Sequence, residues 1–175
     1  MNTLVASRAS EEVTFTVTEC RLGRVLIASG ARGVCAVLLG DDDAALEREL
    51  RARFPRVDLE ADPDDSAGVA ADVRASLESP GRQPSVPLDL RGTAFQRRVW
   101  RALREIPAGR TVSYTALARS LGRPRSARAV AGACAANPLA VLIPCHRAVR
   151  EDGALSGYRW GVERKRRLLE LETAS

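Results

Sequence analysis

Hydrophobic and polar residues alternate near the N-terminus in the pattern of a half-buried β-strand. In Val13–Glu19 the apolar Val, Phe and Val alternate with Thr, which is the two-residue period of a strand with one face in a core. Arg24–Ala28 and the apolar run Val34–Leu39 follow after short turns that contain glycine. Strands joined so closely pair antiparallel. The pattern therefore predicts a three-stranded antiparallel sheet.

Two helices are expected after these strands. The acidic run Asp41–Asp43 supplies an N-cap and favourable first-turn charge for a helix over Ala44–Arg53. An aspartate triplet is also compatible with a metal site, but three consecutive side chains do not converge on one ion, so capping is the preferred interpretation. A second helix is predicted to start at Asp62–Asp65 and to run to Glu78. Sheet and helices together predict an α+β first domain.

The second half of the chain has a helical period. Gly81–Leu90 contains two prolines and is typical of a linker, so we expect a first domain of residues 1–91 and a second of residues 92–175. Three helices follow, each after a capping Thr or Ser: Phe95–Ile106 after Thr93, Tyr114–Leu121 after Ser113 and Ala127–Ala136 after Ser126. The last two are joined by a short Gly/Pro turn, which is the layout of a helix-turn-helix.

The two halves carry opposite charge. Residues 1–91 contain 11 Arg against 16 Asp and Glu, a net charge of −5, whereas residues 92–175 contain 16 Arg and Lys against 6 Asp and Glu, a net charge of +10. A generic arginine-rich surface would be basic in both halves. The basic second half therefore favours a polyanionic partner, and nucleic acid is the first candidate.

The segment Leu139–Arg147 carries the clearest chemistry. Its apolar beginning, Leu139–Ile143, has strand character, and Pro144 biases the residue before it toward an extended backbone. Cys145 and His146, the only histidine, follow directly. Most intracellular cysteines are simply packed as small hydrophobic residues. However, a nucleophile at the floor of a pocket is also often preceded by an apolar segment and a turn and followed by a base. We interpret Cys145 as such a nucleophile.

Composition excludes several other classes. The cysteines at 20, 35, 134 and 145 form no Cys-x-x-Cys pair, and one histidine cannot complete the common zinc patterns. We therefore expect free thiols, no metal and no other cofactor. No apolar stretch approaches the roughly 18 residues of a membrane helix, and the first ten residues lack the apolar core of a signal peptide. The chain is accordingly predicted to be cytoplasmic, monomeric and without membrane contact.

The expected helix Ala127–Ala136 is composed almost entirely of small residues. Apart from Arg128 it offers no side chain that reads base edges in the major groove, so sequence-specific recognition is not expected. Small residues permit close packing inside a protein, and they also permit a helix to approach a DNA backbone or minor groove. The surrounding positive charge favours the second interpretation, with Arg128 placed to enter the base stack.

Several segments of the sequence resemble the O6-alkylguanine-DNA alkyltransferase family. In the second half they are FQRRVW (95–100), IPAGRTVSY (106–114), RAVAGACAANP (128–138), IPCHRAV (143–149) and GALSGYRWGVERK (153–165). In the first half the resemblance extends through VTFTVTECRLGRVLIA and LLGDDDAAL, so that about nine-tenths of the chain is covered. The Pro-Cys-His-Arg core in this context is highly specific to the family.

The resemblance implies transfer of an alkyl group, mainly methyl, from O6 of guanine, or less readily from O4 of thymine, to the protein's own cysteine in one irreversible turnover. It implies an RNase-H-like first domain and a mostly helical second domain, whose winged helix-turn-helix-like motif contacts the minor groove of double-stranded DNA. Cys145 would accept the alkyl group, His146 would remove its proton through a water, and Glu172 would orient the imidazole.

Further residues receive roles from the same resemblance. Asn137 would join the recognition helix to the active-site turn, Tyr114 would lie near the rotated nucleotide, and Arg128 would fill the gap left by the flipped base. The other expected DNA contacts are Ser113, Ala129, Ala131, Gly132 and Ala135. The expected lining of the alkyl pocket is Val141, Val149, Tyr158, Arg159 and Trp160. A bulky Trp160 would favour methyl over larger groups.

Two features differ from parts of the family. The regulatory domain with zinc-bound cysteines that some bacterial members carry is not in this sequence, so transcriptional activation and phosphotriester repair are not expected. Related alkyltransferase-like proteins replace the acceptor cysteine. Cys145 is present here, which favours transfer over mere binding.

Three other functions fit parts of the pattern. A damage sensor would bind and flip alkylated guanine without transfer. A hydrolase would use Cys145, His146 and Glu172 as a triad, but the adjacency of Cys and His and the lack of an evident oxyanion site disfavour it. A helix-turn-helix repressor would need a recognition helix with more side chains to read bases. Thiol alkylation by damaged DNA, an acyl-ester screen and an operator footprint distinguish these alternatives.

Overall fold

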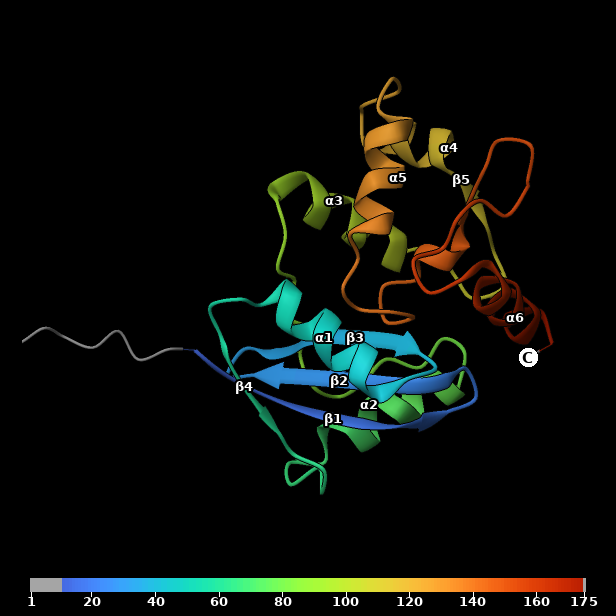
Figure 1. The fold of residues 1–175 in the computed structure, drawn as a ribbon. Helices are drawn as coiled ribbons and strands as arrows, with labels where there is room; N and C mark the ends of the chain where they lie inside the picture. The colour runs from blue at the N-terminus through green and yellow to red at the C-terminus, as the bar shows by residue number, and fades with distance from the viewer. Residues whose placement is uncertain (1–10, 175) are drawn as a thin grey trace, which may run out of the picture.

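A β-sheet forms the lower layer of the computed structural model, which describes residues 11–174 (Figure 1). Strands β1 (Glu12–Cys20), β2 (Gly23–Gly30) and β3 (Gly33–Gly40) pair antiparallel, as predicted from the alternating pattern. Every residue of Val34–Leu39 in β3 is buried. A strand buried on both faces has no polar side to alternate with, which explains its continuous apolar run.

A fourth strand was not predicted. Strand β4 (Asp58–Ala61) pairs parallel to β1, so that the strand order is β3-β2-β1-β4. At this sheet edge Asp58, Glu60 and Ala61 are exposed, and only Leu59 is partly buried. A four-residue edge strand with a single partly buried position is too short to show a hydrophobic period in the sequence.

The first two helices differ in how well their starts were predicted. Helix α1 (Asp43–Arg53) begins where the acidic run indicates, because the Asp42 carboxylate accepts a hydrogen bond from the Ala45 amide at 2.6 Å. Helix α2 (Val69–Glu78) begins several residues later than expected. The preceding acidic segment forms a turn, from which the Asp65 carboxylate accepts hydrogen bonds from two amides of the first turn of α2 at 2.8 Å.

The upper layer is mostly helical. It contains α3 (Ala94–Arg104), α4 (Tyr114–Ser120), α5 (Ala127–Ala135) and α6 (Val162–Thr173), with a two-stranded parallel ladder of β5 (Val112–Ser113) and β6 (Ala148–Val149). Thr93 and Gln96 form a capping box at the start of α3, and the Ser113 hydroxyl caps α4. Ser126 stands at the N-cap of α5, but its side chain makes no capping bond, contrary to expectation. The pair α4 and α5 forms the predicted helix-turn-helix.

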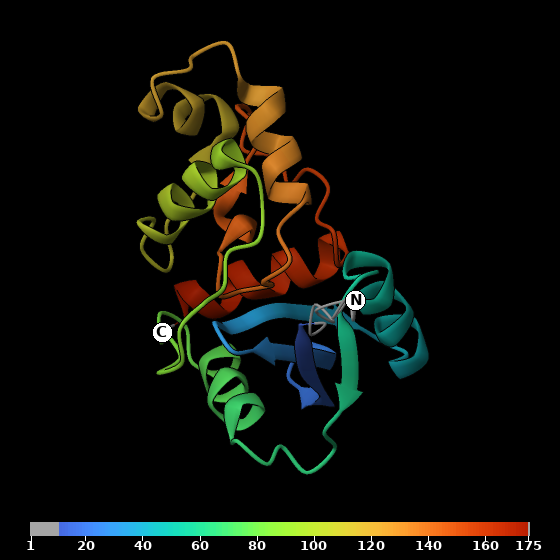
Figure 2. The same cartoon turned by 90° about the vertical axis from the view of Figure 1, so that its left-hand side faces the viewer.

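The two layers are joined along the free edge of β3 and by α6, which lies across the sheet (Figure 2). The Val37 amide donates to the Pro138 carbonyl at 2.8 Å, and the Ala140 amide donates to the Val37 carbonyl at 2.9 Å. The segment that leads to Cys145 is therefore hydrogen-bonded to the sheet. It is not the extended strand that its apolar character suggested, because Leu139–Ile143 folds into tight turns with Val141 at a positive φ of 67°.

Residues 1–10, on which the expectation about a signal peptide rests, lie outside the described part. Within residues 11–174 no helix has both the length and the apolar character needed to cross a bilayer. The division of the chain into domains at residues 91 and 92 stays a prediction.

Candidate active site

Cys145 lies at the start of a buried turn. The residues Cys145–Arg147 form one turn of 3₁₀ helix after Pro144, and the Arg147 amide donates to the Pro144 carbonyl at 3.0 Å. The Cys145 side chain is buried, and so are its two neighbours in the turn. This turn replaces the extended backbone in which adjacent side chains would point apart. Among the described residues, nevertheless, no hydrogen bond joins the Cys145 thiol directly to His146.

Asn137 connects the end of α5 to this turn. Its amide nitrogen donates to the Ile143 carbonyl at 2.9 Å and to the Cys145 sulfur at 3.2 Å. Its amide oxygen accepts from the Leu139 amide at 2.8 Å. Asn137 is fully buried, so these bonds satisfy polar groups that water cannot reach. The side chain fixes both the path of the turn and the position of the sulfur.

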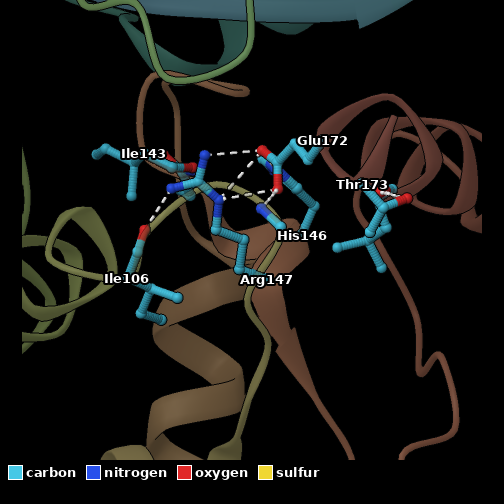
Figure 3. A network of polar contacts seen from close by, with 9 residues as sticks. Ile106, Ile143, His146, Arg147, Glu172 and Thr173 are labelled. Atoms are coloured by element: carbon cyan, nitrogen blue, oxygen red, sulfur yellow. Dashed lines mark hydrogen bonds and ion pairs between the residues drawn. The ribbon is translucent and has the colours of Figure 1, made fainter. Parts of the chain in front are cut away.

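A second buried cluster lies behind the turn (Figure 3). The Glu172 carboxylate is 2.8 Å from His146 Nε2 and accepts hydrogen bonds from Arg147 Nε at 3.1 Å and Arg147 Nη2 at 2.7 Å. It also accepts from the Gly109 amide at 3.2 Å, and Arg147 Nη1 donates to the Ile106 carbonyl. Glu172 in the last helix therefore orients the histidine, and Arg147, to which the sequence assigned no role, balances its charge.

Burial keeps the imidazole of this cluster neutral and outweighs the effect of the carboxylate beside it. Burial would raise the pKa of Glu172, but hydrogen bonds from His146 and Arg147 outweigh it and lower that pKa to about 2. Burial lowers the pKa of His146 below its usual range, although the hydrogen bond and charge of Glu172 oppose the change. His146 Nδ1 is buried without a hydrogen-bond partner among the described residues. A neutral imidazole with one free nitrogen can accept a proton at that nitrogen.

Lys165 was not singled out as a functional residue from the sequence. It is fully buried on α6, and its ammonium donates to the Ala148 carbonyl at 2.7 Å and lies 5.9 Å from the centre of the Tyr114 ring. Burial raises the pKa of the Cys145 thiol to about 11, and both the Asn137 hydrogen bond and the positive charge of Lys165 oppose that rise. The only lysine in a chain rich in arginine was the signal available in the sequence.

The Cys145 side chain opens into a pocket of about 280 Å³. Its lining consists of Tyr114, Ala131, Cys134, Ala135, Cys145, Gly157, Tyr158 and Arg159. Besides Cys145, the family resemblance had placed five of these residues near the DNA or the alkyl group: Tyr114, Ala131, Ala135, Tyr158 and Arg159. The Tyr114 hydroxyl is 2.9 Å from the Ser156 hydroxyl, which fixes the phenol at the pocket wall. The pocket therefore joins the thiol, the predicted DNA-facing helix and the loop before α6.

Three residues expected in the alkyl pocket lie elsewhere. Val141 lines a cavity of about 20 Å³ beside Arg147 and Glu172, because its positive φ turns it away from the thiol. Val149 belongs to β6, where it pairs with Ser113. Trp160 is buried edge-on against the Tyr158 ring, at 5.3 Å between ring centres, and lines a separate groove beside α6. Trp160 is therefore not among the residues that line this pocket, and it contacts the lining residue Tyr158.

The exposed face of α5 carries the small residues expected at DNA. Arg128, Ala129, Gly132 and Ala135 are exposed and Ala131 is partly exposed, whereas Val130, Ala133 and Cys134 face the core. A Cβ atom at Gly132 would meet no atom within 4 Å outside the neighbouring backbone of α5, so the packing of the protein does not require glycine there. Ser113 caps α4, and its hydroxyl accepts from the Ala116 amide at 3.0 Å. This face and the pocket together describe an α/β protein with a buried thiol beside a helix-turn-helix.

Known proteins share these features. A family model described as 6-O-methylguanine DNA methyltransferase, DNA binding domain, matches residues 94–174. The inducible methylated-DNA–protein-cysteine methyltransferase of Bacillus subtilis is 40% identical over 149 residues, covering 83% of this chain and 82% of that protein. The chain belongs to the O6-methylguanine-DNA methyltransferase family, as the resemblance of its motifs predicted.

Two further relatives define the extent of the similarity. The bifunctional transcriptional activator/DNA repair enzyme Ada of Escherichia coli is 54% identical over 160 residues, which are 91% of this chain but 45% of that protein. The chain thus spans about half the length of this relative and matches its C-terminal part. The crystal structure of Mycobacterium tuberculosis OGT in complex with DNA has a TM-score of 0.75 and 34% identity, covering 92% of this chain and 93% of that one.

Proposed function

We propose that the protein repairs alkylated DNA by direct reversal, transferring the alkyl group from O6 of guanine to the sulfur of Cys145. The observation that carries this proposal is the sulfur itself, held by Asn137 in a 280 Å³ pocket with a neutral, carboxylate-oriented histidine behind it. The names of the relatives as methylated-DNA–protein-cysteine methyltransferases agree with it. Methyl is the expected main substrate group, and O4 of thymine is the expected poorer alternative.

Double-stranded DNA is the proposed partner, approached from the minor groove by the exposed face of α5. Small side chains such as Gly132 and Ala135 permit close contact, and Arg128 at the first turn of α5 is exposed and available to fill the gap in the base stack. The O6 atom is inaccessible inside a duplex, so the base must rotate into the pocket at a cost of a few kcal/mol. A relative of this chain has been crystallised with DNA, which supports this partner.

A test of the DNA face uses Gly132. Because Gly132 is exposed and the space at its Cβ position is open, Gly132→Leu should leave the protein folded but should block close approach of a DNA groove. We expect its affinity for duplex DNA to fall by at least about tenfold, since the electrostatic contacts depend on proximity. Gly153→Leu, at another glycine with open space around it, is the matched control for size, although its positive φ of 77° adds some strain. Unchanged affinity for Gly132→Leu would place the DNA on another face.

The thiol must lose its proton before it attacks. We propose that His146 Nδ1, which has no protein partner in the described part, takes that proton through a water while Nε2 stays bonded to Glu172. The thiolate then lies near the buried ammonium of Lys165 and the amide donor of Asn137. Both groups stabilise the charged form of Cys145, which is the nucleophile.

The thiolate attacks the alkyl carbon, and the bond between that carbon and O6 breaks with both electrons going to guanine. The base leaves as an oxyanion that a proton donor neutralises. The Tyr114 phenol, at the pocket wall, can accept from Ser156 while it donates to the base. The thioether formed on Cys145 has no good leaving group, so each molecule should react once.

We further propose that residues 1–91 and 92–175 form two domains, with DNA contact assigned to the second. A cytoplasmic location and a monomeric state complete the proposal. The four cysteines are all free, which fits a reducing compartment.

The transfer itself is tested on the DNA product. The protein is mixed with a duplex that contains one O6-methylguanine, and the DNA is digested to nucleosides. We expect O6-methyldeoxyguanosine to be replaced by an equal amount of deoxyguanosine, with no free base released, and no change with Cys145→Ser. Tight binding of the damaged duplex without loss of the methyl group would instead indicate a damage sensor.

A further inference from the structure

Arg159 at the edge of the Cys145 pocket contacts three separate parts of the fold. Its Nε and Nη2 atoms donate to one carboxylate oxygen of Glu49 on α1, at 3.0 and 2.9 Å. Its Nη1 atom donates to the Ala135 carbonyl at the end of α5, at 3.3 Å. Its own backbone belongs to the loop between β6 and α6, and its side chain lines the pocket. A residue of the sheet layer is thereby linked to the wall of the active-site pocket.

Glu49 pairs with two arginines, and its contacts with Arg159 are the shorter ones. Arg53, one turn further along α1, also donates to Glu49 Oε1, at 3.2 Å. A second nitrogen of Arg53 is buried without a hydrogen-bond partner in the described part of the chain. Burial and the charge of Arg159 both lower the pKa of Arg53, so the two guanidinium groups repel each other. One carboxylate therefore keeps two like charges together at the pocket edge.

Loss of the Glu49 carboxylate would change the position of Arg159 in the pocket lining. Without Glu49, repulsion from Arg53 pushes Arg159 away, and only the bond to Ala135 resists. Tyr158, the next residue, lines the same pocket and packs edge-on against Trp160, with an angle of 72° between the rings. Because Arg159 itself lines the pocket, a shift of its side chain would change the pocket mouth next to Tyr158. Glu49 is partly buried and Arg159 is exposed, with side chains 28% and 36% accessible to solvent, so the pair is screened in part.

We propose that Glu49 is a positioning residue for alkyl transfer, which acts from the sheet layer through Arg159 to fix the mouth of the Cys145 pocket. This inference rests on the transfer reaction proposed above. Under this proposal the sheet layer contributes to the reaction through Glu49, although no residue of that layer lines the pocket. The competing role for Arg159 is a direct contact with a DNA phosphate, for which Glu49 would be a mere neighbour.

The test separates the limiting rate of transfer from affinity for DNA. Methylation of Cys145 by a duplex with one O6-methylguanine is followed over time at increasing protein concentration, with protein in excess. We expect Glu49→Ala to lower the limiting rate by about tenfold, the scale of a misplaced reaction geometry, with the half-saturating concentration unchanged within about twofold. Arg159→Ala should give the same loss. Glu47→Ala, on the same helix and without an ion pair among the described residues, is the matched control and should react like the wild type.

The double variant decides whether Glu49 acts through Arg159. If it does, adding Glu49→Ala to Arg159→Ala should cause no further loss, because the partner is already gone. Additive losses would overturn the proposal, and so would a normal limiting rate in Glu49→Ala. A change confined to half-saturation in Arg159→Ala would assign that residue to phosphate binding instead. A wild-type protein that transfers no methyl group would reject the proposed function as a whole, an outcome distinct from failure of the Glu49 variant alone.

Discussion

Helix α6 carries two buried ionisable residues, Glu172 and Lys165, whose polar surroundings differ. Glu172 is surrounded by donors from His146, Arg147 and the Gly109 backbone. Lys165, seven residues earlier and so about two turns away on the same side of the helix, has one hydrogen bond to a backbone carbonyl. No carboxylate among the described residues forms an ion pair with it. The charge of Glu172 is therefore balanced by neighbouring side chains, whereas the charge of Lys165 has no carboxylate partner in the described part of the chain.

This difference separates two tasks within one site. A paired carboxylate keeps a low pKa and holds the imidazole in place, so Glu172 does its work before any substrate arrives. An unpaired buried ammonium is costly, and its cost is relieved when a negative charge forms beside it. The thiolate of Cys145 is such a charge. We therefore interpret the Glu172 cluster as the orienting part of the site and Lys165 as the part that stabilises the ionised thiol.

The largest expected effect is on stability. Glu172→Gln leaves Arg147 charged and unpaired in the interior, so the free energy of unfolding should fall by about 3–5 kcal/mol, the scale for breaking one side of a buried ion pair. Urea unfolding measures this change. Glu170→Gln, at an exposed position of the same helix, is the control and should alter stability by less than about 0.5 kcal/mol. Equal stability of both variants would show that the cluster is not a compensated pair.

The opposite result is expected at Lys165. Lys165→Met removes an uncompensated charge and keeps an apolar side chain of similar length, so the stability should be unchanged or higher. The thiolate loses the positive charge that favours it, and a rise of one unit in the pKa of Cys145 would slow transfer about tenfold at neutral pH. Unfolding by urea and the rate of methyl transfer are measured on the same protein. Lower stability with normal transfer would reverse the assignment of the two residues.

The pH dependence of stability gives a third comparison. The pKa of Glu172 is depressed from 4.5 to about 2 in the folded protein, so its contribution to stability is complete above pH 4.5 and is lost as the pH falls toward 2. The pKa of His146 is also depressed below its usual 6.5, so protonation of the unfolded chain favours unfolding as the pH drops below 6.5. We expect Glu172→Gln to lack the loss between pH 4.5 and 2. Parallel stability curves for the variant and the wild type over that interval would contradict the assignment.

The smallest expected effect concerns a neutral group without a partner. The Tyr158 hydroxyl is buried and has no hydrogen bond among the described residues. Tyr158→Phe removes an unsatisfied polar group, so the protein should be as stable as the wild type or more stable by about 1 kcal/mol. Thermal unfolding measures this difference. A marked loss of stability would reveal an interaction of the hydroxyl that the geometry does not show.

The parts of the fold with a local pattern were predictable from the sequence. Alternation in β1, the apolar run of β3 and the short glycine turns predicted the three antiparallel strands, and capping residues predicted the starts of α1, α3 and α4. Strand β4 and the late start of α2 were not predicted, since an exposed edge strand and a capped turn leave no periodic signal. The apolar segment Leu139–Ile143 was mistaken for a strand because buried turns and buried strands have the same composition.

Only those residues of the site that belong to recognisable sequence motifs were predictable. Cys145 and His146 follow from their own sequence context, and the resemblance adds Asn137 and Glu172, which the structure brings to the same turn. Lys165 acquires its role from the way α6 packs behind the pocket, which no local pattern records. The placement of Trp160 outside the pocket depends on its contact with Tyr158, a tertiary packing choice.

The central claim is that Cys145 is the sole acceptor and reacts once. Intact mass, followed by peptide mapping, is measured after the protein is mixed with increasing equivalents of a duplex that contains one O6-methylguanine. The account predicts the added mass of a single methyl group, located on Cys145 and saturating at one equivalent, with Cys134 in the same pocket unmodified. A methyl group on Cys134, or turnover beyond one equivalent, would contradict it.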